Sequence, residues 1–460
     1  MTTGRSVQNT TVAIIGCGIA GISTAYYLTE LGGIKDLLLI DADQPMSFTS
    51  AQSGDNYRNW WPHPLMVDFS NDSIDLMEQI ARDSNNRLQM SRRGYAVATR
   101  CKDISSLIEE LGTGYGSRSE IIIRIHERAE SASYQKTISA DQQLGLDGVD
   151  ILQNQDLIRA TFPSFAEDIE SVIHIRRAGE ISGQQMGQYM LEKIHERGGR
   201  RLFGRVTSIE QRDALNIIVY TPDDEITVQA DHLVNAAGPF AGDIAVMLGV
   251  DLPIHNILQQ KIAFDDVAGA IPRDLPFSID YDDQLLDWSD EERELLSKDA
   301  ETAWLTKQML GATHCRPDGG DKGRWVKLGW AYNRTHDQAS WSPDLDDYFP
   351  EIVLRAAARL NPSLKCYYGH LPRAMTHYGG WYSLTDENWP IIGPMGVQKT
   401  FVVGALSGFG TMVACAAGKT CAAWLLGGEL PSYAEDLSLA RYQNTALMQQ
   451  LKTAENTGLL

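Results

Sequence analysis

The chain has 460 residues, which is too long for one simple core and predicts two or more domains. Its apolar content of 43% is ordinary for a globular protein, and its formal net charge of −20 disfavours nucleic acid and anionic membranes as partners. The six cysteines are scattered, without a C-x-x-C pair or a zinc-type cluster, so we expect reduced thiols and no metal. Residues 1–10 lack the features of a signal peptide, and the apolar runs are too short to span a bilayer, so a cytoplasmic protein is expected.

The stretch 11–41 carries the strongest pattern in the chain. An apolar run predicts a buried strand, and the spacing G-x-G-x-x-G follows it, then a helical pattern and a second apolar strand that ends in Asp41. In such a unit the glycines permit a tight turn, the approach of a pyrophosphate and close packing of helix on strand. The helix N-terminus offers N–H groups to phosphates, and Asp41 can accept hydrogen bonds from a ribose. The alternative is a glycine-rich turn without a ligand. The predicted dinucleotide-binding residues are Gly16, Gly18, Ile19, Ala20, Gly21 and Asp41.

Two later junctions repeat this strand-to-helix arrangement. Residues 171–250 return to an alternation of strands and helices, and within them 231–239 read as a strand ending in small residues. A further strand at 401–404 leads through a glycine-bearing turn into a helix at 411–426. Small residues at the carboxyl end of a strand let a ligand lie against the backbone, and a helix N-terminus suits a polar ligand group.

The intervening segments have a different character. Residues 91–170 and 255–370 are rich in alternating strand patterns and turn signals, with a hairpin turn at 316–321 before a strand at 324–332. The acidic stretch 280–301 is expected to form a solvated amphipathic helix, with a lid over a substrate cleft as the alternative. Three glycine-bearing helix entrances exceed the needs of a nicotinamide dehydrogenase and suit a flavin dinucleotide.

Taken in chain order, these motifs resemble the D-amino acid oxidase/glycine oxidase/sarcosine oxidase (DAO) family of flavoenzymes over nearly the whole length. The motifs are the unit at 11–41, Val-Asn-Ala-Ala-Gly at 234–238, Arg-Pro-Asp-Gly-Gly at 316–320, the run 386–394 and the block 404–410. The resemblance implies FAD as cofactor. It adds as cofactor-binding residues Ser53, Gly54, Arg58, Val206, Ala237, Gly238, Gly380, Ser407, Gly408, Phe409, Gly410, Thr411 and Met412.

The resemblance also implies a fold and a division into domains. We expect an α/β fold in which a Rossmann-like FAD-binding domain is interleaved with an α+β substrate domain built on a mixed β-sheet. The FAD-binding domain is expected to be discontinuous, and the chain is expected to end in a C-terminal tail. The expected ranges are 8–90, 171–250 and 371–432 for the FAD-binding domain, 91–170 and 251–370 for the substrate-binding domain, and 433–460 for the tail.

Two places look most like sarcosine oxidase. Residues 53–58 resemble, with one residue inserted, the loop whose arginine lies against the flavin ring, which assigns that role to Arg58. Residues 327–330 resemble the strand whose lysine sits beside the flavin and helps it react with oxygen, which assigns that role to Lys327. A fixed ammonium would stabilise the anion that forms as oxygen takes up an electron. The alternative for Lys327 is an edge-strand lysine facing water.

Departures from sarcosine oxidase shape the expected chemistry. Gly380 stands where a cysteine would carry the flavin covalently, so non-covalent FAD is expected. Met412 stands near where a lysine would hold the substrate carboxylate, and Ala331 replaces an expected histidine, so the substrate should be bulkier than sarcosine. Aromatic residues near a flavin can cage an amine, although such residues more often form core, and His63 can equally be structural. The substrate candidates are Trp60, His63, Tyr378, Trp381 and Tyr382.

The resulting expectation is an FAD-dependent amine or amino-acid oxidase or dehydrogenase. Hydride transfer to the flavin from the carbon beside nitrogen would give an imine, and reoxidation by O2 would give H2O2. One alternative keeps the fold but uses an acceptor other than oxygen, or serves as a tailoring enzyme in natural-product biosynthesis. Another is a non-catalytic flavin-binding protein.

Overall fold

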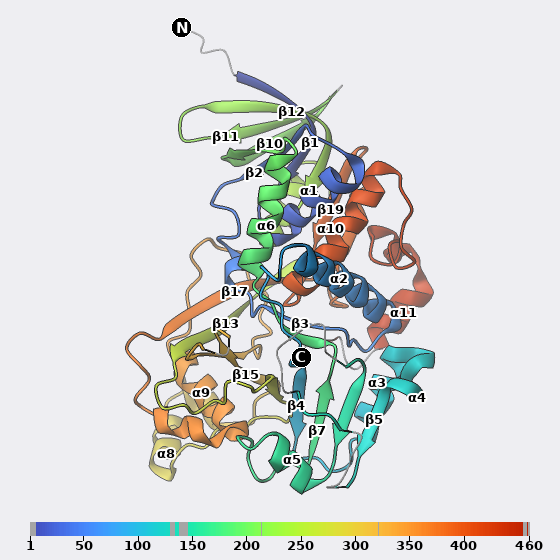
Figure 1. Ribbon diagram of the computed structural model, residues 1–460. Coiled ribbons are helices and arrows are strands. Elements are labelled where there is room, and N and C mark those ends of the chain that lie inside the picture. Colours follow the sequence, from blue (N-terminus) through green and yellow to red (C-terminus); the bar gives the residue numbers. More distant parts are fainter. Residues whose placement is uncertain are drawn as a thin grey trace.

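Two large β-sheets organise the molecule. The protein is described here as a computed structural model, which covers residues 6–128, 134–137, 146–212, 214–320, 322–453 and 458. One sheet lies in the upper half of Figure 1 and the other in the lower half. A two-stranded ribbon of β3 (Asn56–Arg58) and antiparallel β8 (Ala178–Glu180) runs between them. This arrangement confirms the predicted α/β fold with two interleaved parts.

The upper sheet has the parallel centre that dinucleotide-binding folds need. Its strand order is β10-β11-β12-β1-β2-β9, with β19 beside β12 and β18 beside β19. Strand β1 lies between parallel β12 and parallel β2, so its carboxyl end opens at a shared edge of the sheet. The strands are β1 (Ser6–Ile15), β2 (Leu37–Asp41), β9 (Arg200–Phe203), β10 (Arg205–Gln211), β11 (Leu215–Tyr220), β12 (Glu225–Asn235), β18 (Ile391–Pro394) and β19 (Thr400–Gly404).

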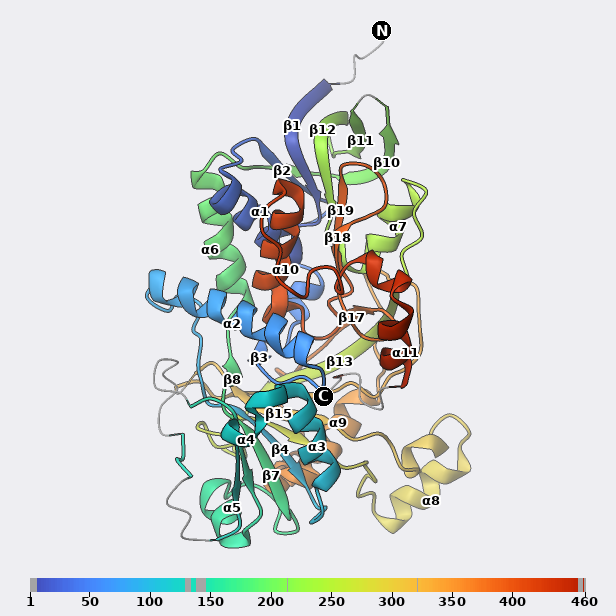
Figure 2. The same cartoon turned by 90° about the vertical axis from the view of Figure 1, so that its right-hand side faces the viewer.

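Helices cover one face of this sheet, as the turned view in Figure 2 shows. Val12 and Ile14 of β1 belong to the core that includes α1 and α10, whereas Ala13 and Ile15 face a smaller core with β10 and β11. Helices α1 and α10 pack closely, since Ser23 Oγ donates to the carbonyl oxygen of Ala414 (2.7 Å). The helices of this half are α1 (Ile19–Gly32), α2 (Pro64–Asp83), α6 (Gly183–Glu196), α7 (Ala241–Val246), α10 (Gly410–Leu426) and α11 (Thr445–Thr453).

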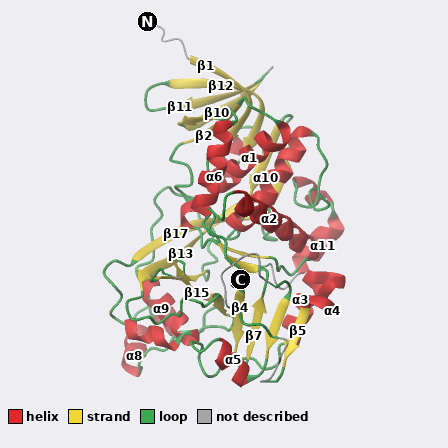
Figure 3. Cartoon of the chain, viewed as in Figure 1, coloured by secondary structure: helices red, strands yellow, loops and turns green. Residues whose placement is uncertain are grey.

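The lower sheet is mixed and has nine strands in the order β17-β13-β16-β15-β14-β4-β7-β6-β5. The pairs β14–β4 and β5–β6 are parallel and the other pairs are antiparallel. The strands are β4 (Tyr95–Thr99), β5 (Ile123–His126), β6 (Val149–Leu152), β7 (Ser171–Ile175), β13 (His255–Asp265), β14 (Phe277–Asp280), β15 (Thr313–Asp318), β16 (Trp325–Trp330) and β17 (Thr376–Leu384). The helices around it, red in Figure 3, are α3 (Ser105–Tyr115), α4 (Ser119–Ile122), α5 (Gln155–Thr161), α8 (Asp290–Lys298) and α9 (Phe349–Leu360).

Alternation along β16 decides which face of the lower sheet can meet a ligand. Val326, Leu328 and Trp330 are buried in a core with α9. Because side chains alternate along a strand, Lys327 and Gly329 point to the opposite face. That face lies toward the upper half of the molecule, where the other sheet opens.

Two expectations about chain organisation need correction. The expected domain ranges placed the segments that begin at residues 171 and 371 in the FAD-binding domain. The first strands of these segments, β7 and β17, instead pair within the nine-stranded sheet. Within the acidic stretch only α8 is helical, because a capping box between Ser289 and Glu292 starts the helix there. Upstream, β14 ends at Asp280 and Leu286 is fully buried outside any helix. The predicted hairpin of β15 and β16 is confirmed, while Asp321 in its turn lies outside the described residues.

Candidate functional site: a two-part cleft

The turn after β1 has the geometry that the glycine pattern predicted. Gly16 has φ +109°, and a Cβ there would lie 2.2 Å from the carbonyl oxygen of Ala236, directly after β12. A Cβ on Gly21 would lie 2.0 Å from the carbonyl oxygen of Gly16, so α1 can approach β1 only with glycine at this position. Asp41 at the end of β2 accepts a hydrogen bond from the N–H of Cys17 (2.5 Å), and burial raises the pKa of its carboxyl. These contacts fix the turn at the open edge of the sheet.

Two connected cavities extend from this turn. A larger one of about 450 Å³ lies over the ends of β1, β2 and β12. A smaller one of about 110 Å³ continues toward β17 and the N-terminus of α10. Both are lined by Gly18, Thr49, Ser50, Ala236, Gly238 and Pro239, so together they form one elongated cleft. Its length along three strand ends and two helix N-termini suits a dinucleotide.

Most of the predicted cofactor residues meet in this cleft. The larger part contains Gly16, Gly18, Asp41, Val206, Ala237 and Gly238. The smaller part contains Ile19, Ala20, Ser53, Gly54, Gly380, Ser407, Gly408, Gly410 and Thr411, together with the substrate candidates Trp381 and Tyr382. Among the described residues, the linings do not include Gly21, Phe409, Met412, Arg58, Lys327, Trp60, His63 or Tyr378.

The entrance to α10 leaves polar atoms without protein partners. Ala405 and Ser407 have φ of 53° and 46°, which turns the chain sharply before the helix. The Oγ atoms of Ser407 and Thr49 are buried and have no hydrogen-bond partner, although both residues line the cleft. A buried hydroxyl without a partner is costly, so these atoms indicate a polar ligand in the cleft.

Arg58 lies in an aromatic cage rather than at the cleft. Its guanidinium is within 6.0 Å of the rings of Trp60, Trp61 and Tyr95. It donates to the carbonyl oxygens of Trp60 (3.2 Å) and Gly458 (2.9 Å), and burial lowers its pKa. The structure therefore does not place Arg58 against a ligand in the cleft.

Three other predicted residues have packing partners. His63 caps α2, since its Nδ1 accepts from the N–H of Leu65 (3.3 Å), and burial lowers its pKa. Phe409 packs edge-on against Trp61 with ring centroids 4.6 Å apart. Met412 Sδ accepts from the N–H of Arg58 (3.1 Å). These contacts favour the structural alternative for His63.

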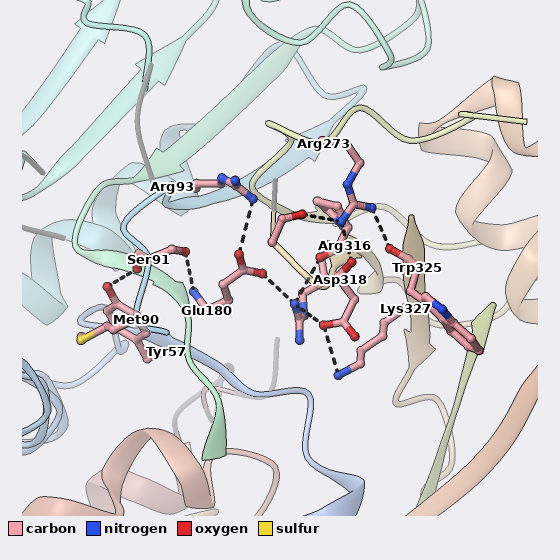
Figure 4. Close-up of polar contacts among 12 residues, drawn as sticks. Tyr57, Met90, Ser91, Arg93, Glu180, Arg273, Arg316, Asp318, Trp325 and Lys327 are labelled. Carbon is pink, nitrogen blue, oxygen red and sulfur yellow. Dashed lines mark hydrogen bonds and ion pairs between the residues drawn. The ribbon is translucent and has the colours of Figure 1, made fainter. Parts of the chain in front are cut away.

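Tyr378 and Lys327 lie near one face of the lower sheet, beside a cluster of charges. Figure 4 shows Lys327 pointing toward Asp318 of β15, with Nζ 3.4 Å from Oδ1. Arg316 contacts the same carboxylate at 3.0 Å and reaches Glu180 of β8 at 2.7 Å. Burial, with Arg316 as the next cause, lowers the pKa of Lys327. Since β16 lies between β13 and β15, the alternative of an edge-strand lysine is wrong.

Arg316 ties this charge cluster to the cleft. Its Nε and Nη2 donate to the carbonyl oxygen of Gly54 (3.2 and 3.1 Å), and Gly54 lines the smaller part of the cleft. Asp55 follows in the same loop and its charge acts on Lys327. Lys327 is therefore connected to the wall of the cleft through Asp318 and Arg316 and is absent from the described lining itself.

Among the described residues, Lys261 of β13 is the lysine in the lining of the cleft, and the sequence analysis did not single it out. It is buried, its Nζ donates to the carbonyl oxygen of Gln52 (3.4 Å), and it lies 5.5 Å from the ring centroid of Tyr382. It pairs with Gly329 across β13 and β16, so it shares the face of Lys327. The alternation of Gln259, Lys261 and Ala263 could have marked this face.

Comparisons with known proteins agree with this geometry. The sequence pattern of the family described as FAD dependent oxidoreductase (DAO) matches residues 11–424. The fold is similar to L-proline dehydrogenase from P. horikoshii, with a TM-score of 0.70 and 15% identity over 95% of this chain and 98% of that one. It is also similar to glycine oxidase from Geobacillus kaustophilus, with a TM-score of 0.69 and 13% identity over 94% and 99% of the two chains.

Two relatives were compared by sequence. D-amino acid dehydrogenase 3 from Mesorhizobium japonicum is 25% identical over 310 residues, which are 59% of this chain and 72% of that protein. Human mitochondrial dimethylglycine dehydrogenase is 21% identical over 97% of this chain, which spans 46% of that protein. The chain therefore spans about half the length of the dimethylglycine dehydrogenase. The match at 11–424 shows that the chain belongs to the DAO family of FAD-dependent oxidoreductases.

FAD is the cofactor of this family, and the described residues fit it. The larger part of the cleft would hold the adenosine and pyrophosphate at Gly16, Gly18 and Asp41, and the smaller part the flavin ring. A Cβ on Gly238 would meet open space, as expected where a ligand lies against the backbone. None of the six cysteines, all of which are described, lines the cleft. Among the described residues, no group of His, Cys, Asp and Glu could hold a metal, and no helix is long and apolar enough to cross a membrane.

Replacing Ser407 with alanine is expected to weaken FAD binding about three- to tenfold, because one hydrogen bond is worth about 0.5–1.5 kcal/mol. The free energy of unfolding of the apoprotein should not fall, since Ser407 Oγ has no protein partner to lose. Titration of apoprotein with FAD and denaturant unfolding measure the two effects. Ser53→Ala is the matched control: its Oγ bonds Thr411 Oγ1 (3.0 Å) and the N–H of Asp55, so it should destabilise the apoprotein. Unchanged FAD affinity in Ser407→Ala would contradict the assignment.

Proposed function

We propose that the protein oxidises the carbon–nitrogen bond of an amine or amino acid, with O2 as the electron acceptor. The observation that carries the proposal is a buried ammonium, Lys261, at the ring end of an FAD-type cleft whose wall also contains Trp381 and Tyr382. The proteins to which this chain is similar support the proposal, since they include glycine oxidase and a D-amino acid dehydrogenase. FAD, when bound, would supply the capacity to take up a hydride.

The protein groups have distinct tasks in this proposal. Lys261 holds an anionic group of the substrate, because its ammonium has no carboxylate among its hydrogen-bond partners in the described chain. Trp381 and Tyr382 exclude water and orient the substrate's apolar part. Lys327 supplies fixed positive charge behind the loop 53–55 while oxygen is reduced. Because an amine can bind in its neutral form, no side chain is required as a strong base.

Anaerobic mixing with a panel of amines and amino acids tests the reaction class. Loss of the oxidised flavin absorbance with a panel member supports the proposal, and absence of bleaching with any member would favour a non-catalytic flavin protein. Admission of oxygen then tests the acceptor. One H2O2 per turnover supports an oxidase, whereas slow reoxidation without H2O2 would favour a dehydrogenase. Acid precipitation should release intact FAD, because Gly380 offers no thiol for a covalent link.

The size of the substrate can be tested by a ratio of specificity constants. Trp381 and Tyr382 at the ring end favour a substrate with an apolar group beyond the amine. An aromatic amino acid or a bulky secondary amine is expected to exceed sarcosine in kcat/KM by about tenfold or more, since each additional apolar contact group is worth roughly 1–3 kcal/mol. Steady-state kinetics with both classes give the ratio. A value below one would contradict the expected preference for bulk.

A further inference from the structure

The connection between β16 and α9, residues 331–348, belongs to the substrate half in sequence yet reaches the cofactor cleft. Apart from one isolated bridge it has no strand or helix, although it is longer than most connections within compact domains. Such long irregular segments are usually either disordered or functional. This one is fully described and is held by defined contacts, so it calls for a functional explanation.

The first half of the connection runs along β13 beyond the end of its pairing with β16. Asn333 Nδ2 donates to the carbonyl oxygen of Leu258 (3.0 Å), and its own carbonyl oxygen accepts from Gln259 Nε2 (2.9 Å). The N–H of Asp337 then donates to the carbonyl oxygen of Asn256 (2.9 Å). These bonds anchor the base of the connection to the lower sheet.

The tip of the connection, Trp341, packs onto the upper half of the molecule. Its ring lies 4.8 Å from that of Phe240, with a stacked interplanar angle of 17°, and 4.8 Å from that of Phe48. Arg205 of β10 lies over the same indole at 5.3 Å. Phe48 follows β2 and Phe240 follows β12, and their rings also stack on each other with centroids 5.7 Å apart, so Trp341 completes a cluster of three aromatic rings. All four side chains line its larger part.

The neighbouring residue contacts the other part of the cleft. The carbonyl oxygen of Ser340 accepts from Trp381 Nε1 (2.9 Å), and Trp381 lines the smaller part. Residues 340 and 341 therefore touch the adenosine end and the ring end together. Trp341 itself is 38% exposed, so it lies at the outer boundary of the cleft rather than within the core.

We propose that residues 331–348 form a strap that closes over bound FAD, with Trp341 as its latch. Aromatic contacts with Phe48 and Phe240 hold the strap down, and the cofactor can enter or leave only when these contacts open. The connection thereby makes cofactor retention depend on a segment of the substrate half. The inference rests on the flavin cofactor alone and is independent of the substrate proposed above.

Replacement of Trp341 with alanine tests the latch. If the contacts of Trp341 hold the strap closed, their loss lets FAD both enter and leave the cleft faster. Release of FAD, followed by its fluorescence in the presence of an excess of competing apoprotein, is expected to become about 10- to 100-fold faster. Uptake of FAD by the apoprotein should also become faster. Trp341→Phe keeps an aromatic ring and should restore most of the wild-type behaviour.

Trp325→Ala is the matched control. Trp325 has the same exposure of 38% and lies on β16, outside the described lining of the cleft. Its release and uptake rates should match wild type, and circular dichroism of the apoproteins should show that all variants are folded. Release in Trp341→Ala within twofold of wild type would overturn the latch. Faster release of FAD with an unchanged rate of uptake would overturn the proposal that the strap gates the cleft. A side chain that only contacts bound FAD affects the release rate alone.

Discussion

Replacing Gly18 with valine is expected to give a folded, colourless protein that no longer retains FAD. Gly18 lines both parts of the cleft, at the point where they join. A Cβ there would already lie 3.1 Å from Ser50 Oγ, which accepts a hydrogen bond from the N–H of Ile19 (3.0 Å). The two further methyl groups of valine must therefore displace Ser50 or occupy the path of the pyrophosphate. A cost of about 3 kcal/mol corresponds to a roughly hundredfold rise in Kd.

Flavin absorbance of the purified protein and titration of apoprotein with FAD measure this effect. Gly112→Val is the control, because Gly112 lies in α3 and a Cβ there meets no atom within 4 Å. It introduces the same β-branched side chain without approaching the cleft, and it should remain yellow. Wild-type affinity for FAD in Gly18→Val would contradict the proposed path of the pyrophosphate.

Replacing Lys327 with methionine is expected to slow reoxidation of the reduced flavin by oxygen by roughly 100- to 1000-fold. Loss of one fixed charge that stabilises a developing anion costs about 2.7–4 kcal/mol. Reduction of the flavin by substrate should change little, because Lys327 is absent from the described lining of the cleft. Stopped-flow absorbance separates the two half-reactions.

Lys261→Met is the matched variant on the neighbouring strand. It should raise the Kd of a carboxylate-bearing substrate in the reductive half-reaction by roughly tenfold or more, since a hydrogen bond to a charged group is worth about 1.5–3 kcal/mol. An uncharged amine should be affected far less. If Lys261→Met rather than Lys327→Met slows reoxidation, the oxygen-facing charge belongs to Lys261. If neither variant slows it, oxygen activation by Lys327 or Lys261 is excluded.

The sequence predicted those parts of the site whose residues lie close together along the chain. The turn at 16–21 and the junction at 407–411 are each set by one strand, one turn and one helix, so residue spacing was sufficient. Lys261 was missed because its position depends on how β13 pairs with β16, about sixty residues later in the chain. Trp341 was missed because an irregular connection has no periodicity that fixes its path.

Arg58 illustrates a different limit of local reasoning. Its loop resembles that of sarcosine oxidase, but the direction of a side chain on β3 depends on the groups that pack around this strand. The guanidinium packs against Trp60 and Trp61 and is absent from the described lining of the cleft. A short motif therefore predicts the position of the backbone better than the direction of its side chains.

The parts of the cleft are far apart in the chain, and this affects the order in which they are made. The parallel partner of strand β1, β12, is synthesised more than two hundred residues after β1. Helix α10, whose N-terminus completes the ring end, is synthesised later still. A nascent chain on the ribosome therefore carries the phosphate-binding turn without a finished cofactor site until α10 has been made. Contacts so distant in sequence form slowly, so FAD binds after the synthesis of α10 and not as soon as the turn has been made.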